Sequence, residues 1–365
     1  MQLIMWLKAK VKMKKLLRKI RRKKDEVPQP SSRITNETVA EHRERILAGG
    51  RRFKYPLQYV RHKLVINAIL ISVAALVVVI AVGWWQLYPV QNTSEFMYRV
   101  TKVVPVPVAE VDGQPVPYSD YLMRYRSSIY YLEQKEGVSL RSDDGQRQID
   151  YVKQQSMQEA IADAYANKLA KDMGLSVTDA ELEGFLADQR ASNGGMSEQA
   201  YDAIIMDYYD WSPSEYRHAT RNDLLRQKVA YKIDTKASDL VNTISTTLKK
   251  DSSTNLKSLA AEIAKENGAA KVSYGVSGLV PRDNRDGGLA LAATKLAKSQ
   301  VSSVIKSTTG DGYYFVRLLD SNKTHVNYEY IQVPLTMFVD SLATLAHNGE
   351  VKEYISIPKI ATGDQ

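Results

Sequence analysis

One uncharged stretch constrains this chain more than any other feature of its sequence. Residues 64–85 form a run of 22 residues that is apolar apart from Asn67, Ser72 and Gly83. About 20 apolar residues are enough for a helix to cross a hydrocarbon core of roughly 30 Å. Two tryptophans and a tyrosine lie at the end of the run, as aromatic residues do at a membrane interface. We therefore predict one transmembrane helix at residues 64–88.

A cleaved signal peptide is the alternative interpretation of this run. The run is too long for one, begins more than 60 residues into the chain and is not followed by a small-residue cleavage site. Residues 1–63 hold 19 Lys and Arg against 5 Asp and Glu, a net charge of +14. The whole chain carries +9, so 9 − 14 leaves −5 for the remainder. Because basic segments stay in the cytoplasm, we expect an anchored protein of the cell membrane, with residues from about 89 onward extracytoplasmic.

The basic head at residues 1–63 is predicted to begin with an amphipathic helix and to continue as a polar linker. Residues 1–24 combine 11 Lys and Arg with apolar residues that share a helical face: Met13, Leu16, Leu17 and Ile20. We expect this helix to lie on anionic lipid beside the anchor. Nucleic acid binding needs the same cations, but no cluster of base-stacking aromatic residues accompanies them, so we disfavour it. Residues 25–60 are predicted to be a polar linker with one short helix near residues 37–47.

The outer body begins with a hairpin and a helix. Asp112-Gly113 accepts the positive φ angles of a tight turn after a short strand. Ser119 is expected to cap a helix that ends near Gly137. Tyr121 and Tyr125 lie on one side of this helix, so they are expected to be core residues or, alternatively, to contact a bound peptide.

Further helices follow in succession, each with its own boundary signal. A helical pattern over residues 146–173 ends at Gly174. Thr178 and Ser212 each begin a capping box, the second with proline at the first helical position, and Ser197 starts a helix between them. The helix after Ser212 should continue to about residue 231. One hairpin and four or five helices make a small, mainly helical domain.

The order of these elements resembles a known family. The segments "VAEVDGQPVPYSDYL", "MQEAIADAYANKLAKDMGLSVTDAELEGFLADQ" and "SEQAYDAIIMDYYDWSPSEYRHATRNDLLRQKV" are similar to the N-terminal chaperone domain of SurA/PrsA-type extracytoplasmic foldases. The resemblance covers about residues 105–232. It implies a domain that holds unfolded or exported polypeptides.

A second, α+β domain is expected after Asp234. Helix signals at residues 236–250 and 254–267 precede strand signals at 271–277, 313–319 and 326–333. The segments "VSYGVSGLVPR" and "LALAATKLAKSQVSSVIKSTTGDGYYFVRLLD" resemble the later two thirds of a parvulin-type prolyl isomerase domain. Its "QVS" and "Gly-Tyr" motifs are present here, although Ser299 stands where the family prefers glycine.

The parvulin resemblance implies two histidines that this chain lacks. One would directly follow Gly312-Tyr313, where Tyr314 stands, and the other would lie in a first strand near residues 229–235, which contains none. Leu289 stands in place of a phenylalanine of the proline pocket. We therefore predict a non-catalytic domain with Leu289 and Tyr314 as the candidate lining of a peptide-holding pocket, and we assign no catalytic residue. For the strand that holds Tyr314, the other interpretation is that both of its sides lie in the core. Weak activity is the alternative, because isomerisation mainly requires twisting and desolvating an amide against a barrier of about 18–20 kcal/mol.

Other chemistry receives no support from the sequence. The oxygen-rich residues 283–287 lack the spacing and terminal glutamate of a calcium loop. The chain has no cysteine, hence no disulfide and no thiolate metal site, and it contains no nucleophile elbow, phosphate loop or histidine-metal motif. We expect neither a metal nor a cofactor.

The sequence thus predicts an α+β protein with one transmembrane helix. The expected division is a basic cytoplasmic segment, the anchor, a linker, a SurA-N-like helical chaperone domain, a parvulin-like domain and a C-terminal segment that returns to the chaperone domain: 1–63, 64–88, 89–104, 105–234, 235–322 and 323–365. The predicted function is a membrane-anchored extracytoplasmic chaperone or foldase. Alternatives are an active peptidyl-prolyl cis-trans isomerase and a structural tether between the cytoplasmic face and the envelope.

Overall fold

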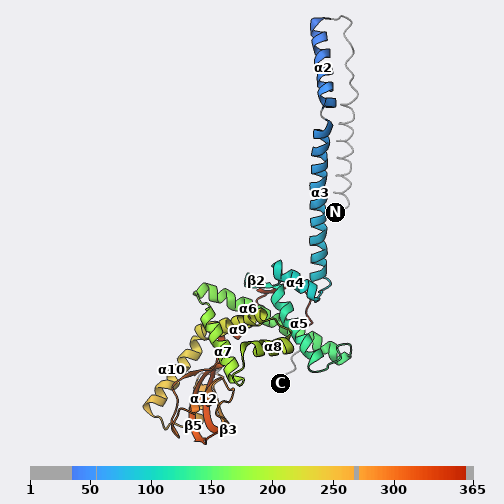
Figure 1. Ribbon diagram of the computed structural model, residues 1–365. Coiled ribbons are helices and arrows are strands. Elements are labelled where there is room, and N and C mark those ends of the chain that lie inside the picture. Colours follow the sequence, from blue (N-terminus) through green and yellow to red (C-terminus); the bar gives the residue numbers. More distant parts are fainter. Residues whose placement is uncertain (1–34, 55, 267–270, 359–365) are drawn as a thin grey trace. The chain divides into compact units, whose positions relative to one another are not determined.

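The chain divides into two compact units that we describe separately. The computed structural model describes residues 35–54, 56–266 and 271–358 (Figure 1). One unit comprises Met1–Val82 and the other Gly83–Gln365. The predicted amphipathic helix at residues 1–24 lies outside the described residues. The chain is of mixed class and 60% helical.

In the described part of the first unit, the residues expected to form a polar linker with one short helix are mainly helical. Helix α2 covers Asn36–Lys54 and is longer than the short helix predicted near residues 37–47. Helix α3 covers Pro56–Leu87, and its last turn belongs to the second unit. Within α3, Lys63–Leu87 is long and apolar enough to cross a membrane, with a hydropathy of 3.0. This segment matches the span predicted from the sequence.

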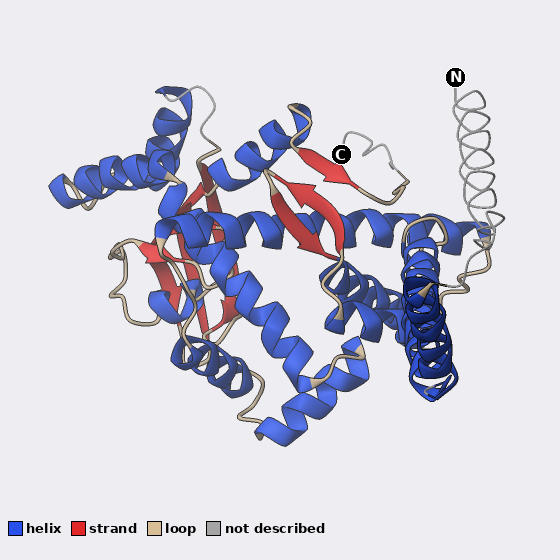
Figure 2. Cartoon of the chain, turned by 90° about the horizontal axis from the view of Figure 1, so that it is seen from above, coloured by secondary structure: helices blue, strands red, loops and turns tan. Residues whose placement is uncertain are grey.

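The first half of the second unit is a helical domain with a small sheet. Its elements in chain order are α4 Glu95–Val103, β1 Pro107–Val111, β2 Gln114–Pro117, α5 Tyr118–Gln134, α6 Asp143–Met173, α7 Asp179–Ser192, α8 Glu198–Tyr209 and α9 Pro213–Ile233. Figure 2 shows that the strands of the chain form two separate groups among the helices. Tyrosines, aliphatic residues and alanines of α5, α6 and the hairpin make one continuous core.

Local signals placed most of these helix boundaries correctly. Thr178 and Ser212 each form a complete capping box, and the Ser197 hydroxyl accepts the backbone N–H of Ala200 at 3.2 Å. Gly174 ends α6 with φ of +65°, a left-handed conformation that favours glycine. The prediction that Ser119 caps a helix was wrong. Helix α5 begins one residue earlier, at Tyr118, and its N-cap is Pro117, which has an extended backbone (φ −62°, ψ 132°) and makes no side-chain capping bond.

Residues 89–104, predicted to be a linker, contain helix α4. The Ser94 hydroxyl caps the helix by accepting the backbone N–H of Met97 at 3.4 Å. Met97, Tyr98 and Thr101 are buried against the domain. The segment is therefore an integral part of the folded body, because one face of α4 contributes to its core.

The second half of the unit is built on a four-stranded antiparallel sheet in the order β3-β6-β5-β4. Its elements are α10 Thr235–Lys250, α11 Leu256–Glu266, β3 Ser273–Pro281, α12 Leu289–Ala293, β4 Ile305–Lys306, β5 Gly312–Ser321 and β6 His325–Pro334. Apolar residues of α10 and α11 pack with Tyr313 and Phe315 of β5. Residues of α12 pack with Tyr314 and Val316, which alternate with them along the strand.

Two predictions for this domain were wrong. Residues 229–235 form no strand, because α9 continues to Ile233 and Asp234 then caps α10 by accepting the backbone N–H of Ala237 at 2.8 Å. The predicted domain boundary at residue 322 is also misplaced. Strand β6 pairs with both β3 and β5, so it belongs to the sheet and not to a returning segment.

The chain after β6 ends beside the hairpin of the helical domain. Helix α13 covers Met337–His347, and strand β7 covers Val351–Glu353. Strand β7 pairs antiparallel with β1, which gives a sheet in the order β2-β1-β7. Phe338 and Ile355 lie buried in the core of the helical domain. The C-terminal elements therefore pack on the first part of this unit.

Candidate functional site

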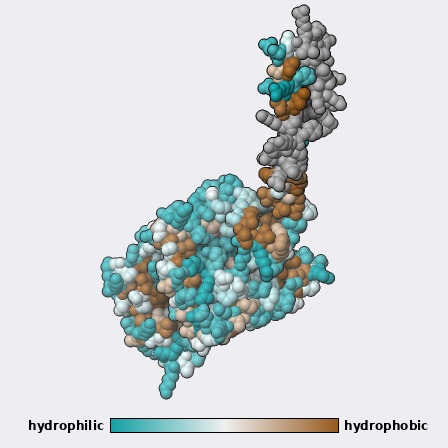
Figure 3. Space-filling model, turned by 45° about the horizontal axis from the view of Figure 1, so that its top comes forward, coloured by the Kyte–Doolittle hydropathy of each residue, from teal (hydrophilic) through white to brown (hydrophobic). Residues whose placement is uncertain are grey.

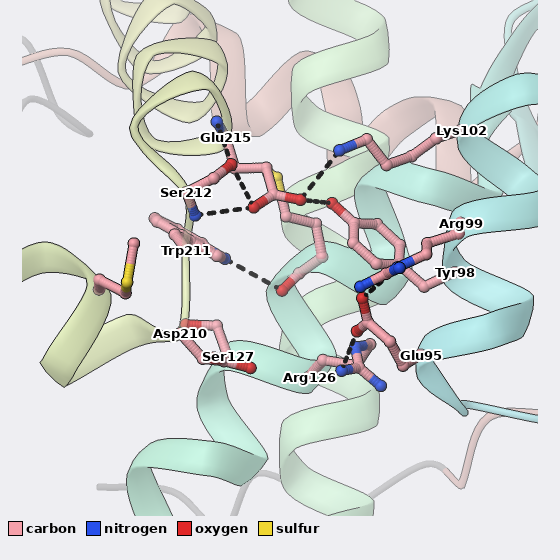
Figure 4. A pocket seen from close by; sticks show the side chains of 12 residues that line it. Glu95, Tyr98, Arg99, Lys102, Arg126, Ser127, Asp210, Trp211, Ser212 and Glu215 are labelled. Atoms are coloured by element: carbon pink, nitrogen blue, oxygen red, sulfur yellow. Dashed lines mark hydrogen bonds and ion pairs between the residues drawn. The ribbon is translucent and has the colours of Figure 1, made fainter.

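A pocket of roughly 500 Å³ opens between α4, α5 and the connection from α8 to α9 (Figure 4). Each of these elements contributes polar and apolar side chains. The residues that we use below are Glu95, Tyr98, Lys102, Arg126, Met206, Trp211 and Glu215. Most of the side chains drawn in Figure 4 are linked by hydrogen bonds and ion pairs, so their positions are fixed before any ligand enters.

Glu215 joins the helices that surround the pocket. It is the third residue of α9, where its Oε2 accepts the backbone N–H of Ser212 at 2.8 Å and the Ser212 hydroxyl at 2.6 Å. Its Oε1 accepts the Tyr98 hydroxyl at 2.5 Å and lies 3.0 Å from Lys102 Nζ. One carboxylate therefore completes the capping box of α9 and ties α4 to it.

These contacts keep Glu215 ionised. Burial opposes ionisation, but hydrogen bonds from Ser212, Tyr98 and Lys102 outweigh it and lower the pKa of Glu215 to about 2. Burial and the neighbouring carboxylate raise the pKa of Tyr98. Neither group exchanges a proton near neutral pH, so the pair organises the pocket and does not serve as an acid or base.

Cations lie against the Tyr98 ring. Lys102 Nζ lies 5.3 Å and Arg126 Cζ 5.8 Å from the ring centroid. Arg126 also donates to Glu95 at 2.5 Å and to the carbonyl oxygen of Thr93 at 3.0 Å. Because acidic and basic residues occur in equal number around the pocket (Glu95, Asp210 and Glu215 against Arg99, Lys102 and Arg126), it carries no net charge. It is not built for a strongly charged ligand.

The other side of the pocket is aromatic and contains methionine. The indole N–H of Trp211 donates to the carbonyl oxygen of Met123 at 3.3 Å. Its ring stacks on Tyr209, with centroids 5.3 Å apart. Met206 lies at the edge of the pocket and is 52% exposed. This side offers flexible and flat apolar surfaces next to the polar groups.

Helix α8 continues this apolar surface outside the pocket. Its exposed large apolar side chains, which we call the α8 rim, are Ile204, Met206, Tyr208 and Tyr209. Tyr201 and Ile205 of the same helix are buried. Lys135 holds one edge of the rim, because it pairs with Asp207 at 2.8 Å and lies 5.3 Å from the centroid of the Tyr208 ring. An exposed apolar patch next to a pocket is typical of a surface that contacts other polypeptides.

Comparison with protein families finds a family similar to this part of the chain. Residues 57–230 match the SurA-like N-terminal domain. The match includes the apolar segment of α3 and every residue of the pocket and the α8 rim. It supports the SurA/PrsA-type family and ends before the four-stranded sheet. No curated protein matches the chain.

Within this SurA-like domain, the two tyrosines predicted to contact peptide lie in the core. Tyr121 and Tyr125 stack with ring centroids 6.0 Å apart, and their exposed fractions are 2% and 8%. They are on α5, which also lines the pocket through Met123, Arg126 and Ser127. Their role in peptide binding stays a prediction, and the structure gives them a packing role.

Leu289 and Tyr314, the other two predicted site residues, lie together in a different core. Both are buried between β5 and α12. The Tyr314 hydroxyl donates to Asp311 at 2.5 Å, and its ring lies 5.7 Å from that of Tyr330. The structure therefore brings Leu289 and Tyr314 together but leaves them in a separate cluster from Tyr121 and Tyr125. Their predicted pocket-lining role also remains a prediction.

Sequence reasoning missed the residues that surround the pocket. The stretch "MDYYDWSPSE" holds Met206, Trp211 and Glu215, but we interpreted it only as a helix end and a capping box. The density of aromatic residues directly before that box was the available signal. Tyr98 gave no signal, because its partner Glu215 lies 117 residues further along the chain. Among the described residues, no group of three His, Cys, Asp or Glu side chains is arranged to hold a metal ion.

Proposed function

We propose that this protein is a membrane-anchored extracytoplasmic chaperone that holds unfolded segments of exported proteins in the pocket and on the α8 rim. The observation that carries the proposal is an exposed surface of tyrosine and methionine beside a pocket of zero net charge, inside a SurA-like N-terminal domain. Methionine and tyrosine adapt to many apolar partners. Broad selectivity for unfolded chains follows from that composition.

Anchoring belongs to the same proposal. The apolar part of α3 directly precedes the SurA-like body and is long enough to span a bilayer. The charge of +14 on residues 1–63 favours a cytoplasmic N-terminus. The pocket then lies outside the cytoplasmic membrane, where exported chains arrive unfolded. Protease added to intact cells should digest the second unit and leave the basic head protected.

The parvulin-like domain is proposed to hold or position polypeptides without isomerising them. Tyr314, which stands where the family has histidine, is buried and bonded to Asp311. Leu289 is buried beside it in the same cluster. The proposed domain covers residues 235–335, because β6 is part of its sheet. A proline-peptide assay tests this directly, and a rate enhancement that is lost on changing Tyr314 and Leu289 would favour the isomerase instead.

Binding of a permanently unfolded protein tests the main proposal. The full chain in nanodiscs is titrated against a reduced and alkylated model protein that carries a fluorescent label, and anisotropy gives Kd. The triple variant Met206→Ser, Tyr208→Ser, Tyr209→Ser removes most of the α8 rim. We expect about tenfold weaker binding, which corresponds to about 1.4 kcal/mol.

A matched control distinguishes client binding by this surface from non-specific binding to any exposed apolar residue. Tyr151 on α6 and Val339 on α13 are also large, apolar and exposed. The double variant Tyr151→Ser, Val339→Ser should bind the unfolded protein as the parent does. Equal weakening by both sets of changes, or the absence of binding by the parent, would refute the proposed client surface.

A further inference from the structure

Helix α4 has a second face that the pocket does not use. Met97, Tyr98 and Thr101 point into the body, whereas Phe96 and Val103 point away from it. Val103 and Phe96 are exposed by 82% and 71%, the largest fractions among the large apolar side chains of the described residues. They exceed even the values for residues 63–87 of α3. Apolar side chains that are exposed next to one another mark a surface for contact with a membrane or another protein.

This face lies close to the end of the apolar helix. Only residues 88–94 separate α3 from α4, and they fold back on the helix end, since Asn92 N donates to the carbonyl oxygen of Gln86 at 2.9 Å. Exposed apolar residues continue across this region with Trp84, Trp85 and Val90. Figure 3 shows apolar side chains gathered where the end of α3 meets the body.

The last turn of α3 and its connection are fixed to the body by hydrogen bonds. The Tyr118 hydroxyl donates to the carbonyl oxygen of Leu87 at 2.7 Å, and the Tyr88 hydroxyl donates to that of Pro107 at 2.6 Å. Arg126 donates to the carbonyl oxygen of Thr93 at 3.0 Å. Because α4 follows this fixed connection directly, its outer face keeps a constant position relative to the last turn of α3.

A cation borders the outer face. Arg99 lies between Phe96 and Val103 at helical spacing, at the edge where this face meets the pocket that Arg99 also lines, and its side chain is 75% exposed. Glu95, one turn earlier, is paired with both Arg99 and Arg126, so no unpaired acid faces outward from the start of the helix. Apolar residues that flank an exposed arginine are typical of helices that lie in a membrane interface.

We propose that the outer face of α4, formed by Phe96 and Val103 and bordered by Arg99, lies on the surface of the same bilayer that α3 crosses. The apolar side chains enter the boundary between headgroups and acyl chains, and Arg99 contacts lipid phosphates. This inference rests on the proposed anchoring by α3. It places the pocket, which meets the outer face of α4 at Arg99 and extends along the helix through Tyr98 and Lys102, within about one helix diameter of 10–12 Å from the membrane surface.

The absence of cysteine from the chain makes a direct test available. Single variants Phe96→Cys and Val103→Cys are labelled with the environment-sensitive fluorophore NBD. The full-length proteins are placed in nanodiscs of phosphatidylcholine and phosphatidylglycerol. Leu76→Cys in α3 reports on anchoring, and Val276→Cys on β3 is the exposed control. Nitroxide-labelled lipids quench from the membrane, and iodide quenches from water.

We expect NBD at positions 96 and 103 to emit at shorter wavelength than at 276. Nitroxide near the headgroups should quench it, and iodide should quench it several times less than it quenches the label at 276. Position 76 should respond to nitroxide deep in the acyl chains. The double variant Phe96→Ser, Arg99→Glu with NBD at 103 should become accessible to iodide while its circular dichroism stays that of a folded protein.

Each contrary outcome has a distinct meaning. Lipid contact at position 76 together with aqueous behaviour at 96 and 103 would overturn the interfacial role of α4 and leave the anchor intact. Aqueous behaviour at all three positions would overturn both proposals. Shielding at 96 and 103 from iodide without quenching by lipid nitroxide would assign this face to a second copy of the chain and refute lipid contact.

Discussion

The Tyr98 hydroxyl donates a 2.5 Å hydrogen bond to Oε1 of Glu215, which joins the first helix after the anchor to the N-terminus of α9. Hydrogen bonds to charged groups contribute about 1.5–3 kcal/mol when they are shielded from water. The variant Tyr98→Phe keeps the buried ring and removes only the donor. We expect it to lower the free energy of unfolding by about that amount, measured by pulse proteolysis in urea.

The control for this change is Tyr151→Phe on α6, where the tyrosine is exposed. It should alter the free energy of unfolding by less than about 0.5 kcal/mol. Client binding by Tyr98→Phe should weaken as well, because the wall of the pocket loses its link to α9. Unchanged stability in Tyr98→Phe would show that Lys102 and Ser212 alone hold the Glu215 carboxylate.

A buried arginine connects three helices of the SurA-like domain. Arg124 of α5 donates to Asp163 at 2.6 Å and to Glu159 at 2.5 Å, and Arg226 of α9 pairs with Asp163 at 3.2 Å. Burial raises the pKa of Asp163 despite these cations. Removing Arg124 leaves the charge of Asp163 buried without this partner. The variant Arg124→Leu should therefore lower the free energy of unfolding by about 3–5 kcal/mol.

The matched control is Arg147→Leu on α6, which breaks an exposed ion pair with Asp144. Exposed pairs contribute about 0–1 kcal/mol, and this variant should unfold at almost the same urea concentration as the parent. A similar loss in both variants would mean that the buried ion pairs of Arg124 contribute no more to stability than the exposed pair of Arg147.

The parts of the fold that the sequence predicted correctly are those fixed by short-range contacts. The Thr178 and Ser212 boxes close within three residues, so their helices could be placed before any tertiary contact was known. The prediction of a strand at residues 229–235 was wrong for a related reason. Its apolar residues alternate like a strand, but the capped helix α9 propagates through them to Ile233.

The candidate site could not be predicted in the same way. A stripe such as Tyr121 and Tyr125 shows which residues share a helix face, but not whether that face meets solvent or core. The structure buries this stripe and exposes Tyr208 and Tyr209 instead. The pocket joins residues from α4 and α9 that lie more than 100 positions apart. Such contacts follow only from the packing of the whole domain.

The C-terminal elements should stabilise the helical domain, a dependence that a single side chain can test. Phe338 of α13 is buried, and its ring lies 5.5 Å from that of Tyr165 on α6. Replacing a buried phenylalanine by alanine costs about 3–5 kcal/mol through lost contacts and the cavity that remains. We expect Phe338→Ala to destabilise the SurA-like domain by this amount, measured as protease cleavage within α5 and α6.

The neighbouring residue provides the control. Val339 is 64% exposed on the same helix, so Val339→Ala should change the free energy of unfolding by less than about 0.5 kcal/mol. If Phe338→Ala released only the sheet domain and left α5 and α6 protected, the returning segment would not support the helical domain.

His218 on α9 should give this domain a stability that falls as the pH rises. Its Nε2 lies 3.1 Å from Asp120 Oδ1 on α5, and this hydrogen bond raises the pKa of the imidazole above its ordinary value near 6.5, although burial and Arg124 oppose the shift. Asp163 adds a further attraction for the charged ring. A raised pKa in the folded state means that the ion pair contributes fully below pH 6.5 and is lost as the pH rises through the folded pKa.

Because His218 is about half exposed, the effect should be modest, about 0.2–1 kcal/mol. The free energy of unfolding should therefore decrease from pH 6 to pH 8.5 by this amount more in the parent than in His218→Gln. Identical pH profiles for the parent and His218→Gln would show that the contact with Asp120 carries no charge-dependent stability.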